Sequence, residues 1–268
     1  MGLFDVHAHL THPQMPVEAD EAVARARAAG LTTIVVNGLH PADNLAVRAL
    51  ARRHPEVKAA LGFYPVEAVR LAMAANGQDV PGEKELAVAP EEGIASVLDG
   101  LGEAVAVGEI GLDGYWVPPA YWDAQEAVFR RLVRAAMDAD LPVIIHSRKR
   151  EERTFEVLSE MGATKVNWHC FGGRVKLAVR IAAAGHRLSL PANLHRSQSF
   201  QRMVDLLPRD ALLTETDCPF LGPEVGIPST PADVSRTVDT LAAMWGVSRT
   251  QAIDQLASNF EGLFGFPP

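Results

Sequence analysis

Cysteine is scarce in this sequence, because its 268 residues include only Cys170 and Cys218. Neither lies in a CxxC pair of the kind that binds zinc or carries out redox chemistry, and two cysteines provide no disulfide framework. We therefore expect two small buried thiols. A run of about 18 apolar residues is also missing, so the sequence predicts no membrane-spanning helix. The first apolar run, residues 3–10, is too short and too polar for a secretory signal, and we expect a cytoplasmic protein.

Positive charge is in short supply as well. The sequence has 25 Lys and Arg residues against 33 Asp and Glu residues, which gives a formal net charge of −8. Such a molecule repels polyanions as a whole, so a broad nucleic-acid-binding face of the repressor type is not expected. A small basic patch beside a bound metal ion is compatible with this charge. Nothing in the composition implies a membrane or an obligate protein partner.

Short apolar and β-branched runs recur along the whole chain, each followed by a turn and then by a stretch with helical periodicity. This alternation is typical of parallel βα units, and eight of them predict an α/β protein, a single-domain TIM (β/α)8 barrel over residues 1–268. A doubly wound open sheet is the main alternative, but it requires a GxGxxG turn where this sequence has DVHAHL. The expected strands are residues 3–7, 32–37, 57–63, 104–109, 142–146, 165–169, 187–190 and 211–216.

Several of the intervening helices have recognisable ends. Gly30 and Gly162 follow two helical stretches as C-terminal caps, Pro41 opens a third, and Ser248 is expected to be the N-cap of the last one. Residues 64–101 are too long for one ordinary βα connection. We expect this segment to contain an extra helix within a surface excursion rather than a second domain.

Histidines alternate at the end of the first expected strand, in the motif DVHAHL. Residues i and i+2 share a face of a strand, so His7 and His9 point the same way and can hold one cation. Alone, the pair would be interpreted as two structural histidines. In a TIM barrel, however, the carboxyl ends of all strands converge on the active site. Metal-binding side chains recur at four more of these ends: Glu109 in VGEIGLD, His146 in VIIHSR, His169 in VNWHC and Asp217 in LLTETD.

These six side chains predict a divalent metal centre. Charged groups and imidazoles in a barrel mouth are costly to desolvate unless they are paired or bind a cation. Four histidines and two carboxylates exceed the ligand set of a mononuclear site, so we expect one or two ions, with Glu109 as the bridging carboxylate. Mixed nitrogen and oxygen ligands favour zinc (Zn), manganese (Mn), iron (Fe) or nickel (Ni) over magnesium (Mg), and these metals all stay open.

Two further carboxylates share strand faces with the expected ligands. Asp5 precedes His7 by two residues and is expected either to hold a histidine ring nitrogen or to be an ordinary buried hydrogen-bonding residue. Glu215 precedes Asp217 by two residues and is expected to orient a ligand or a water molecule.

The motifs DVHAHL, GEIGLD, PVIIHSR, WHCFGG and LLTETDCPFLGP occur in this order, and SNFEGLF lies near the end of the chain. Together they resemble the TatD family of metal-dependent deoxyribonucleases over nearly the whole chain. The resemblance implies a TIM-barrel hydrolase of the amidohydrolase-like kind with the same six metal ligands. It also implies a magnesium- or manganese-dependent exonuclease that acts on DNA, and in some members on RNA, from the 3′ end.

Two loops differ from the family pattern. Tyr64 in GFYPVE stands where many members have a histidine, and GIPSTP at residues 226–231 replaces an RNEP stretch. Both loops are expected to face the substrate. Besides a 3′–5′ exodeoxyribonuclease-type phosphodiesterase, two alternatives therefore stay open. One is a metal-dependent hydrolase of a small ester, lactone, amide or aminoacyl bond, and the other is a non-catalytic metal-binding barrel.

The expected chemistry is attack by a metal-activated water molecule on a phosphodiester. Asp217 is the expected general base, since a carboxylate beside both the metal and the water can take the proton, and Glu109 is the second expected catalytic residue. A purely structural role as a metal ligand is the alternative for Asp217.

Substrate contacts are expected from the loops at the mouth, with DNA or RNA ends as the substrate. Arg148, two residues after His146, can bind a phosphate through two hydrogen bonds, and His195 is a second candidate for substrate contact. Tyr115 and Trp116 either stack against a base or pack within their loop.

Overall fold

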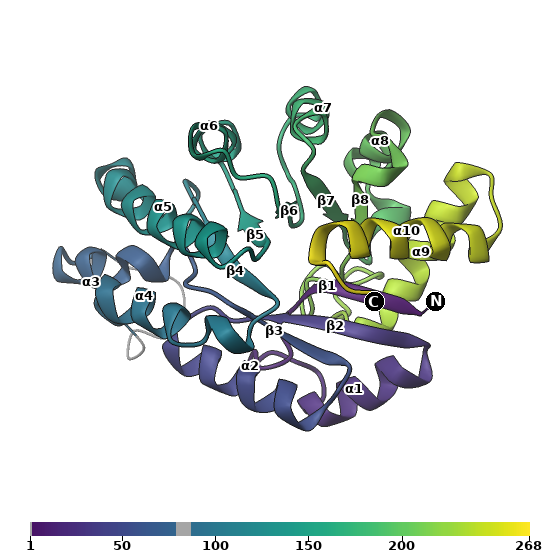
Figure 1. The fold of residues 1–268 in the computed structure, drawn as a ribbon, viewed down its shortest axis with the longest axis horizontal. Helices are drawn as coiled ribbons and strands as arrows, with labels where there is room; N and C mark the ends of the chain where they lie inside the picture. Colours follow the sequence, from purple (N-terminus) through teal and green to yellow (C-terminus); the bar gives the residue numbers. More distant parts are fainter. Residues whose placement is uncertain (1, 79–86) are drawn as a thin grey trace.

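Eight parallel strands surround the centre of the molecule, and helices cover them from outside (Figure 1). The structure is a computed structural model that describes residues 2–78 and 87–268. Within this part of the chain each strand pairs with the next one in sequence, and every pairing is parallel. The strands are β1 (Leu3–Ala8), β2 (Leu31–Asn37), β3 (Val57–Leu61), β4 (Ala106–Gly111), β5 (Val143–His146), β6 (Val166–Trp168), β7 (Arg187–Leu190) and β8 (Leu212–Thr214).

The expected barrel is confirmed, and each expected strand is present with its ends shifted by a few residues at most. The strands read as nearly continuous apolar runs because both of their faces are covered, one by the helices and one by the barrel interior. Every residue of β1 and of β4 is buried, for example. This explains why the runs were recognisable without a strict alternation of apolar and polar residues.

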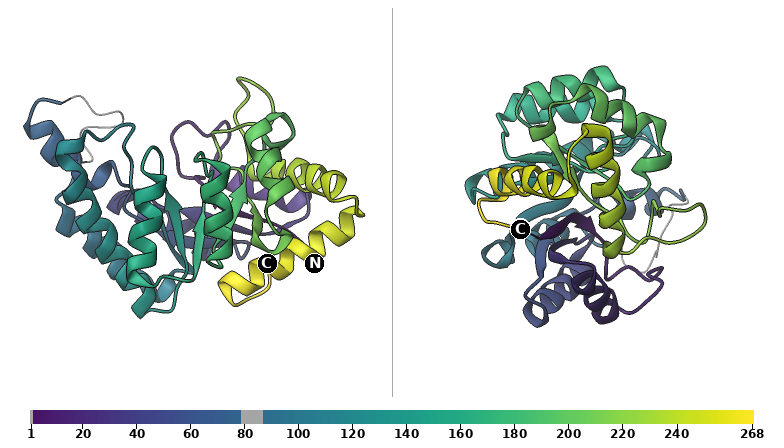
Figure 2. Two further views of the ribbon diagram at one scale, coloured as in Figure 1. Left: turned by 90° about the horizontal axis from the view of Figure 1, so that it is seen from above. Right: turned by 90° about the vertical axis from the view of Figure 1, so that its right-hand side faces the viewer.

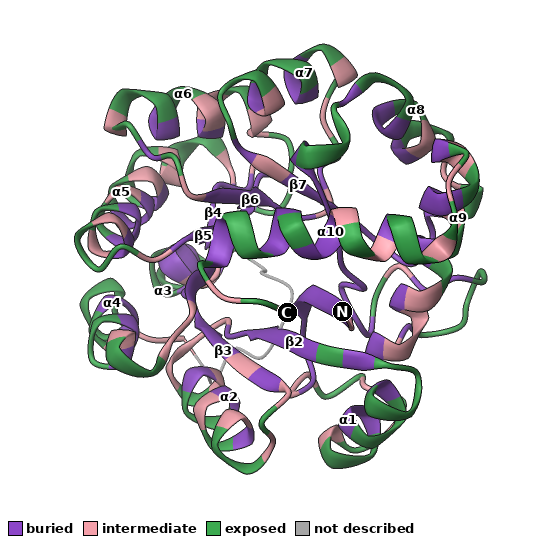
Figure 3. Cartoon of the chain, turned by 45° about the vertical axis from the view of Figure 1, so that its right-hand side comes forward, coloured by how far each residue is buried: buried purple, intermediate pink, exposed green. Residues whose placement is uncertain are grey.

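The helices form an outer layer whose buried faces turn toward the strands and whose exposed faces turn outward (Figure 3). The buried faces are mostly apolar. In α5, for example, Phe129, Leu132 and Val133 are buried, whereas Arg131 is exposed. The helices are α1 (Ala19–Ala28), α2 (Pro41–Arg53), α3 (Glu67–Ala75), α4 (Pro90–Leu98), α5 (Trp122–Asp138), α6 (Glu151–Met161), α7 (Val175–Ala183), α8 (Gln198–Leu206), α9 (Val234–Trp245) and α10 (Arg249–Phe264).

The helix ends follow the local rules on which they were predicted. Ser248 is the N-cap of α10 and forms a reciprocal capping box with Gln251, and Pro41 is the first residue of α2. Gly162 follows α6 with a φ of 71°, the left-handed conformation that glycine adopts without steric cost. These caps satisfy backbone groups that the helices leave unpaired.

The barrel closes between β8 and β1 through the side chain of Asp5. Its carboxylate accepts hydrogen bonds from the backbone N–H of Thr216 at 3.1 Å and from the Thr216 hydroxyl at 2.5 Å. The hydroxyl of Thr214 adds a bond to the carbonyl of Phe4 at 2.8 Å. Side chains therefore join the first and last strands where no regular ladder connects them.

An aromatic cluster closes the end of the barrel at which the strands begin. Phe260 of α10 is fully buried, and its ring centroid lies 4.8 Å from that of Phe4 on β1. Phe264 and Phe266 pack on the same ring at 4.4 and 5.3 Å. The side chain of Asn259 donates to the carbonyl of Leu212 and so ties α10 to the start of β8. Both chain termini lie at this end, beside α10 (Figure 2).

The long connection between β3 and β4 contains two helices, α3 and α4, where an ordinary βα connection has one. The extra helix expected within residues 64–101 is therefore present. Residues 79–86 of this segment lie outside the described part of the chain. In the described part of the chain, no helix combines the length and the apolar character needed to cross a bilayer.

Candidate metal centre

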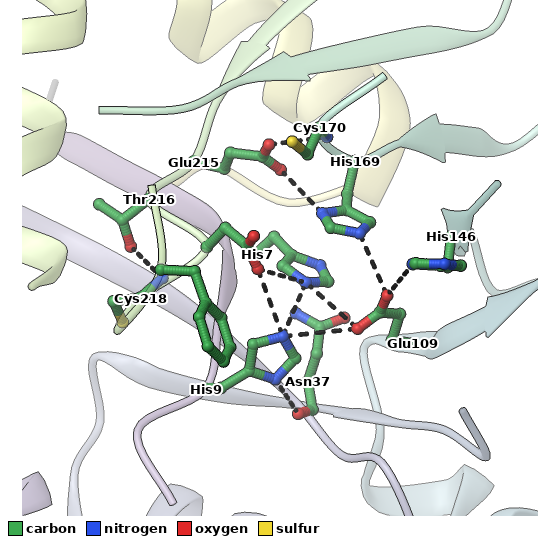
Figure 4. A network of polar contacts seen from close by, with 12 residues as sticks. His7, His9, Asn37, Glu109, His146, His169, Cys170, Glu215, Thr216 and Cys218 are labelled. Atoms are coloured by element: carbon green, nitrogen blue, oxygen red, sulfur yellow. Dashed lines mark hydrogen bonds and ion pairs between the residues drawn. The ribbon is translucent and has the colours of Figure 1, made fainter. Parts of the chain in front are cut away.

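The structure brings the six predicted ligand residues together at the carboxyl ends of the strands. Figure 4 shows His7, His9, Glu109, His146 and His169 turned toward one another. Each of the six is at least nine-tenths buried. His7 lies within β1 and His146 ends β5, whereas Glu109 lies inside β4, two residues before its end. The other three follow their strands: His9 after β1, His169 after β6 and Asp217 after β8.

Asp217 reaches the histidine pair because the chain after β8 continues along β1. Its backbone N–H donates to the carbonyl of His7 at 2.9 Å, and the N–H of His9 donates to the carbonyl of Cys218 at 3.0 Å. Asp217 itself has a φ of 55°, a left-handed conformation that aspartate tolerates better than most residues. This turn directs its carboxylate toward His7 and His9.

One group of ligand atoms consists of two imidazole nitrogens and two carboxylate oxygens. The Nε2 atoms of His7 and His9 lie 3.0 Å apart. Asp217 Oδ1 is 3.5 Å from both nitrogens, and Glu109 Oε2 is 3.5 Å from His7 and 3.4 Å from His9. Two ring nitrogens this close face each other favourably only when a proton or a cation lies between them.

A second group lies on the other side of Glu109. Its Oε1 atom is 2.9 Å from His146 Nδ1 and 3.1 Å from His169 Nε2. Glu109 therefore directs one oxygen at each group, which is the arrangement of a carboxylate that bridges two ions. The rings of His7 and His169 stack at a centroid distance of 3.8 Å and hold the two groups side by side.

Electrostatics divide four of the buried carboxylates, Asp5, Glu109, Glu215 and Asp217, into two pairs. Burial alone would raise the pKa of Glu109 and of Asp217, but the surrounding histidines outweigh it and lower both. Burial raises the pKa of Asp5 to about 7 and that of Glu215 well above its usual range, because hydrogen bonds do not fully compensate. The histidines thus favour the ionised form of Glu109 and Asp217, whereas burial favours the protonated form of Asp5 and Glu215.

This donor set fits divalent cations. Nitrogen and carboxylate oxygen atoms converge from five strands or strand ends. Ligand atoms lie within 4.8 Å of one another in each of two sets, His7 with His9 and Asp217, and Glu109 with His146 and His169. The Nδ1 atoms of His7 and His169 are buried without a hydrogen-bond partner among the described residues. Imidazole and carboxylate together suit zinc, manganese, iron or nickel.

Asp113 is a functional candidate that the sequence analysis missed. It lies two residues beyond β4 and is fully buried, and its Oδ2 atom is 2.8 Å from His146 Nε2. A carboxylate behind a histidine fixes the tautomer and the ring orientation of a metal ligand. Hydrogen bonds to Asp113 and Glu109 outweigh burial and raise the pKa of His146 to about 9. The final Asp of the motif GEIGLD was the available signal.

The two carboxylates expected behind the ligands differ in position. Glu215 accepts from the hydroxyl of Ser189 at 2.6 Å and the N–H of Cys170 at 2.8 Å, and it lies 3.9 Å from His169 Nδ1. Asp5, in contrast, holds no imidazole ring: it accepts from the backbone N–H of His7 at 3.0 Å and from Thr216. The first of its two expected roles is thus replaced by closure of the barrel.

Neither of the two expected substrate contacts belongs to a ligand group of this centre. Arg148 is exposed, and its guanidinium carbon lies 3.6 Å from the ring centroid of Tyr115. His195 is exposed on a short 3-10 turn, Leu194–Arg196, and the structure does not bring it into either ligand group. Tyr64, absent from the expected contacts, packs its ring edge-on against His146 at 4.9 Å.

Comparison with known proteins agrees with this geometry. The family model described as "TatD related DNase" matches residues 4–265. The metal-dependent hydrolase YabD of Bacillus subtilis, described as uncharacterized, is 33% identical over 225 residues, 82% of each chain. Deoxyribonuclease TATDN3 of Homo sapiens is 29% identical over 98% of this chain and 95% of its own length. The 3′-5′ ssDNA/RNA exonuclease TatD of Escherichia fergusonii is 28% identical over 82% of this chain and 80% of its own.

A solved structure extends the likeness to three dimensions. The TatD homologue YjjV from Escherichia coli superposes with a TM-score of 0.83 at 26% identity, covering 99% of this chain and 98% of that one. The match of the family model thus spans nearly the whole barrel, including all six residues of the candidate metal centre. The chain belongs to the TatD-related DNase family of metal-dependent hydrolases.

Proposed function

We propose that this protein is a metal-dependent phosphodiesterase that removes nucleotides from the 3′ ends of DNA or RNA. One observation carries the proposal: the two oxygens of Glu109 face two separate sets of imidazoles at distances of 2.9 to 3.5 Å. Enzymes that hydrolyse phosphodiesters commonly use two ions about 3.5–4 Å apart, and a bridging carboxylate sets this spacing. The relatives named as deoxyribonuclease and as ssDNA/RNA exonuclease support the choice of substrate.

The residues that would hold the ions form two sets, and both sets include Glu109. His7, His9 and Asp217 would hold one cation together with Glu109 Oε2, and His146 and His169 would hold the other together with Oε1. When bound, such ions supply positive charge to the phosphate oxygens and lower the pKa of a coordinated water molecule toward neutrality.

Asp217 is the residue placed to accept the proton of the attacking water. Its side chain is 13% exposed, more than the side chains of Glu109 at 4% or Glu215 at 0%, so it borders the space that a substrate enters. Its lowered pKa keeps the carboxylate ionised and able to accept a proton at neutral pH. Glu215 does not border that space, because it is fully buried and accepts hydrogen bonds from Ser189 and Cys170.

Arg148 would hold the phosphate. Arginine binds phosphate oxygens through two parallel hydrogen bonds, and this one is exposed two residues after His146. Among the described residues no carboxylate forms an ion pair with Arg148, whereas Arg153 in the following helix pairs with Glu126. The charge of Arg148 is therefore available to a ligand.

The test is degradation of single-stranded DNA and RNA labelled at the 5′ end, in the presence of Mn²⁺ or Mg²⁺. We expect stepwise shortening from the 3′ end that stops on chelation and is lost in Asp217→Asn. Asp205→Asn on the exposed face of α8 is the matched control and should keep full activity. Failure of the wild-type protein to release nucleotides with any divalent metal would refute the proposal.

A second candidate function has one observation in its favour, which is Tyr64 at a position where many family members carry a histidine. Burial and nearby carboxylates raise the pKa of Tyr64 well above its usual range, so its hydroxyl stays a neutral hydrogen-bond donor on a ring that contacts His146. Such a donor suits the carbonyl oxygen of an ester, lactone or amide. Hydrolysis of these substrates without hydrolysis of DNA or RNA would select this function.

A further inference from the structure

Tyrosine and tryptophan are rare in this chain but gather on one side of the barrel mouth. All 3 tyrosines and 2 of the 4 tryptophans occur between positions 64 and 122, after β3 and β4 and at the start of α5. Tyr64, Tyr121 and Trp122 pack against a small apolar cluster that includes Val69 and Val117. Rings with one polar end are typical of binding surfaces, so this side of the mouth differs from the phenylalanine-rich core.

Tyr115 and Trp116 are the members of this group that face solvent. They are 50% and 41% exposed, and their rings meet edge to face at a centroid distance of 4.6 Å. Large apolar side chains in a connecting loop usually pack inward, which is what Val117 does at 1% exposure. The exposed pair therefore offers ring surface to a ligand rather than to the core.

Asp113 ties this pair to the metal centre. Its Oδ1 atom accepts hydrogen bonds from the backbone N–H groups of Tyr115 at 2.8 Å and Trp116 at 2.6 Å, while Oδ2 lies 2.8 Å from His146 Nε2. One fully buried carboxylate thus fixes both a predicted metal ligand and the backbone that carries the rings. The backbone that carries the rings is therefore anchored to the residue that contacts His146.

Arg148 joins the rings to the phosphate position. Its guanidinium carbon lies 3.6 Å from the Tyr115 centroid and 5.9 Å from the Trp116 centroid, a cation–π arrangement. The N–H of Gly114 donates to the carbonyl of Arg148 at 2.9 Å, so the two loops are also joined through their backbones. A positive charge beside exposed rings matches a nucleotide, which has an anionic phosphate beside an aromatic base.

We propose that Tyr115, Trp116 and Arg148 form a nucleotide-binding platform, on which a base of a single-stranded nucleic acid end stacks while its phosphate reaches Arg148 and the metal centre. This inference rests on the proposed function and adds to it the recognition of an unpaired base. Stacking is tolerant of sequence, since every base has a π-face, so the platform selects single strands over duplexes without selecting a base. A small ester or lactone has no base that could stack on these rings.

The experiment compares two oligonucleotides that differ only in the terminal residue, a normal 3′ nucleotide or a 3′ abasic residue, with Mn²⁺ and the wild-type protein. We expect the normal end to be cleaved with a KM about tenfold lower than the abasic end. Tyr115→Ala and Trp116→Ala should each reduce that ratio toward one, and Trp116→Phe should preserve it. Leu206→Ala, which removes an apolar side chain of 53% exposure from α8, is the matched control and should leave the ratio unchanged.

A parallel measurement of binding in the Asp217→Asn background separates the platform from the reaction. Tighter binding of the base-bearing end that Tyr115→Ala abolishes would support the platform even if the wild-type protein cleaved no nucleic acid. Cleavage of both ends at equal KM, or a preference that both alanine variants retain, would overturn the platform while the proposed function stood. Equal binding of both ends together with absence of cleavage would overturn both.

Discussion

The two ends of the barrel are made from the same eight strands but have opposite chemistry. Where the strands begin, Phe4 meets Phe260 and Phe264 of α10 in a dry aromatic cluster. Where they finish, ionised Glu109 and Asp217 are buried among four histidines. In TIM barrels the end where the strands begin serves stability, and the end where they finish serves function. The residue types at the two ends of this barrel follow the same division.

The two ends of the barrel also differ in how burial affects stability. Apolar burial contributes roughly 25 cal/mol per Å², so the aromatic end stabilises the fold without any partner. Buried charges at the other end are costly unless they are compensated, which a divalent cation would do. We therefore predict that substitutions at the metal centre mainly change activity, whereas substitutions in the aromatic cluster mainly change stability.

Asp217→Asn should have the largest effect on activity. The amide keeps the size of the side chain but cannot accept the proton, so kcat should fall by about 10²–10⁴-fold. Because the neighbouring histidines stabilise the ionised carboxylate in the folded protein, its removal should lower the free energy of unfolding slightly. Single-turnover kinetics and urea denaturation of the same sample measure both quantities. A variant with wild-type kcat would show that the proton goes elsewhere.

Phe260→Ala should have the largest effect on stability. Truncation of a fully buried phenylalanine costs about 3–5 kcal/mol, and the resulting cavity lies at the end of the barrel away from the metal centre. Activity per folded molecule should stay the same. Phe266, which is only half-buried on the same cluster, provides the control, because Phe266→Ala should cost less. Loss of kcat in folded Phe260→Ala would contradict the proposed separation of the two ends.

Asp113→Asn tests whether metal binding at the barrel mouth depends on residues that contact the ligand side chains from behind. We expect metal affinity or activity to fall by about 10–100-fold, since His146 would lose the carboxylate that fixes its ring. Metal titration followed by activity measures the change, with Asp123→Asn near the start of α5 as control. Equal metal affinity and equal activity in wild type and Asp113→Asn would show that His146 needs no such partner.

The smallest effect is expected from His186, which lies just before β7 at the aromatic end. Its Nδ1 accepts from Trp168 Nε1 at 3.1 Å, and its Nε2 lies 3.0 Å from the carbonyl of Ala163. Burial is the main cause that lowers its pKa below 6.5 in the folded protein. As pH falls below about 6.5, the unfolded chain therefore takes up a proton before the folded one does, and stability decreases.

This contribution is absent above about pH 7.5 and cannot exceed ~1.4 kcal/mol per pH unit. Urea denaturation between pH 5 and 8 measures it, and His186→Asn should flatten that part of the profile. If the free energy of unfolding of His186→Asn depended on pH as in the wild type, other groups would be responsible for the pH dependence.

Most of the fold and the six clustered residues followed from the sequence, because each depended on a local pattern. Parallel strands give apolar runs, and the rule that strand ends converge turned scattered residues such as His7 and Asp217 into neighbours. Asp113 was missed because its partner His146 is 33 positions away, so the motif GEIGLD contains this residue without showing what its side chain contacts. The role of Asp5 was open for the same reason, since its partner Thr216 is 211 positions away.

Metal content measured by elemental analysis of the purified protein, compared between wild type and Glu109→Gln, tests the account most directly. We predict about two divalent ions per chain in the wild type. In Glu109→Gln we predict loss of at least one ion, with normal folding by circular dichroism. An active wild-type protein without metal, or a Glu109→Gln variant that keeps its full complement of ions, would contradict the claim that this carboxylate bridges a metal centre.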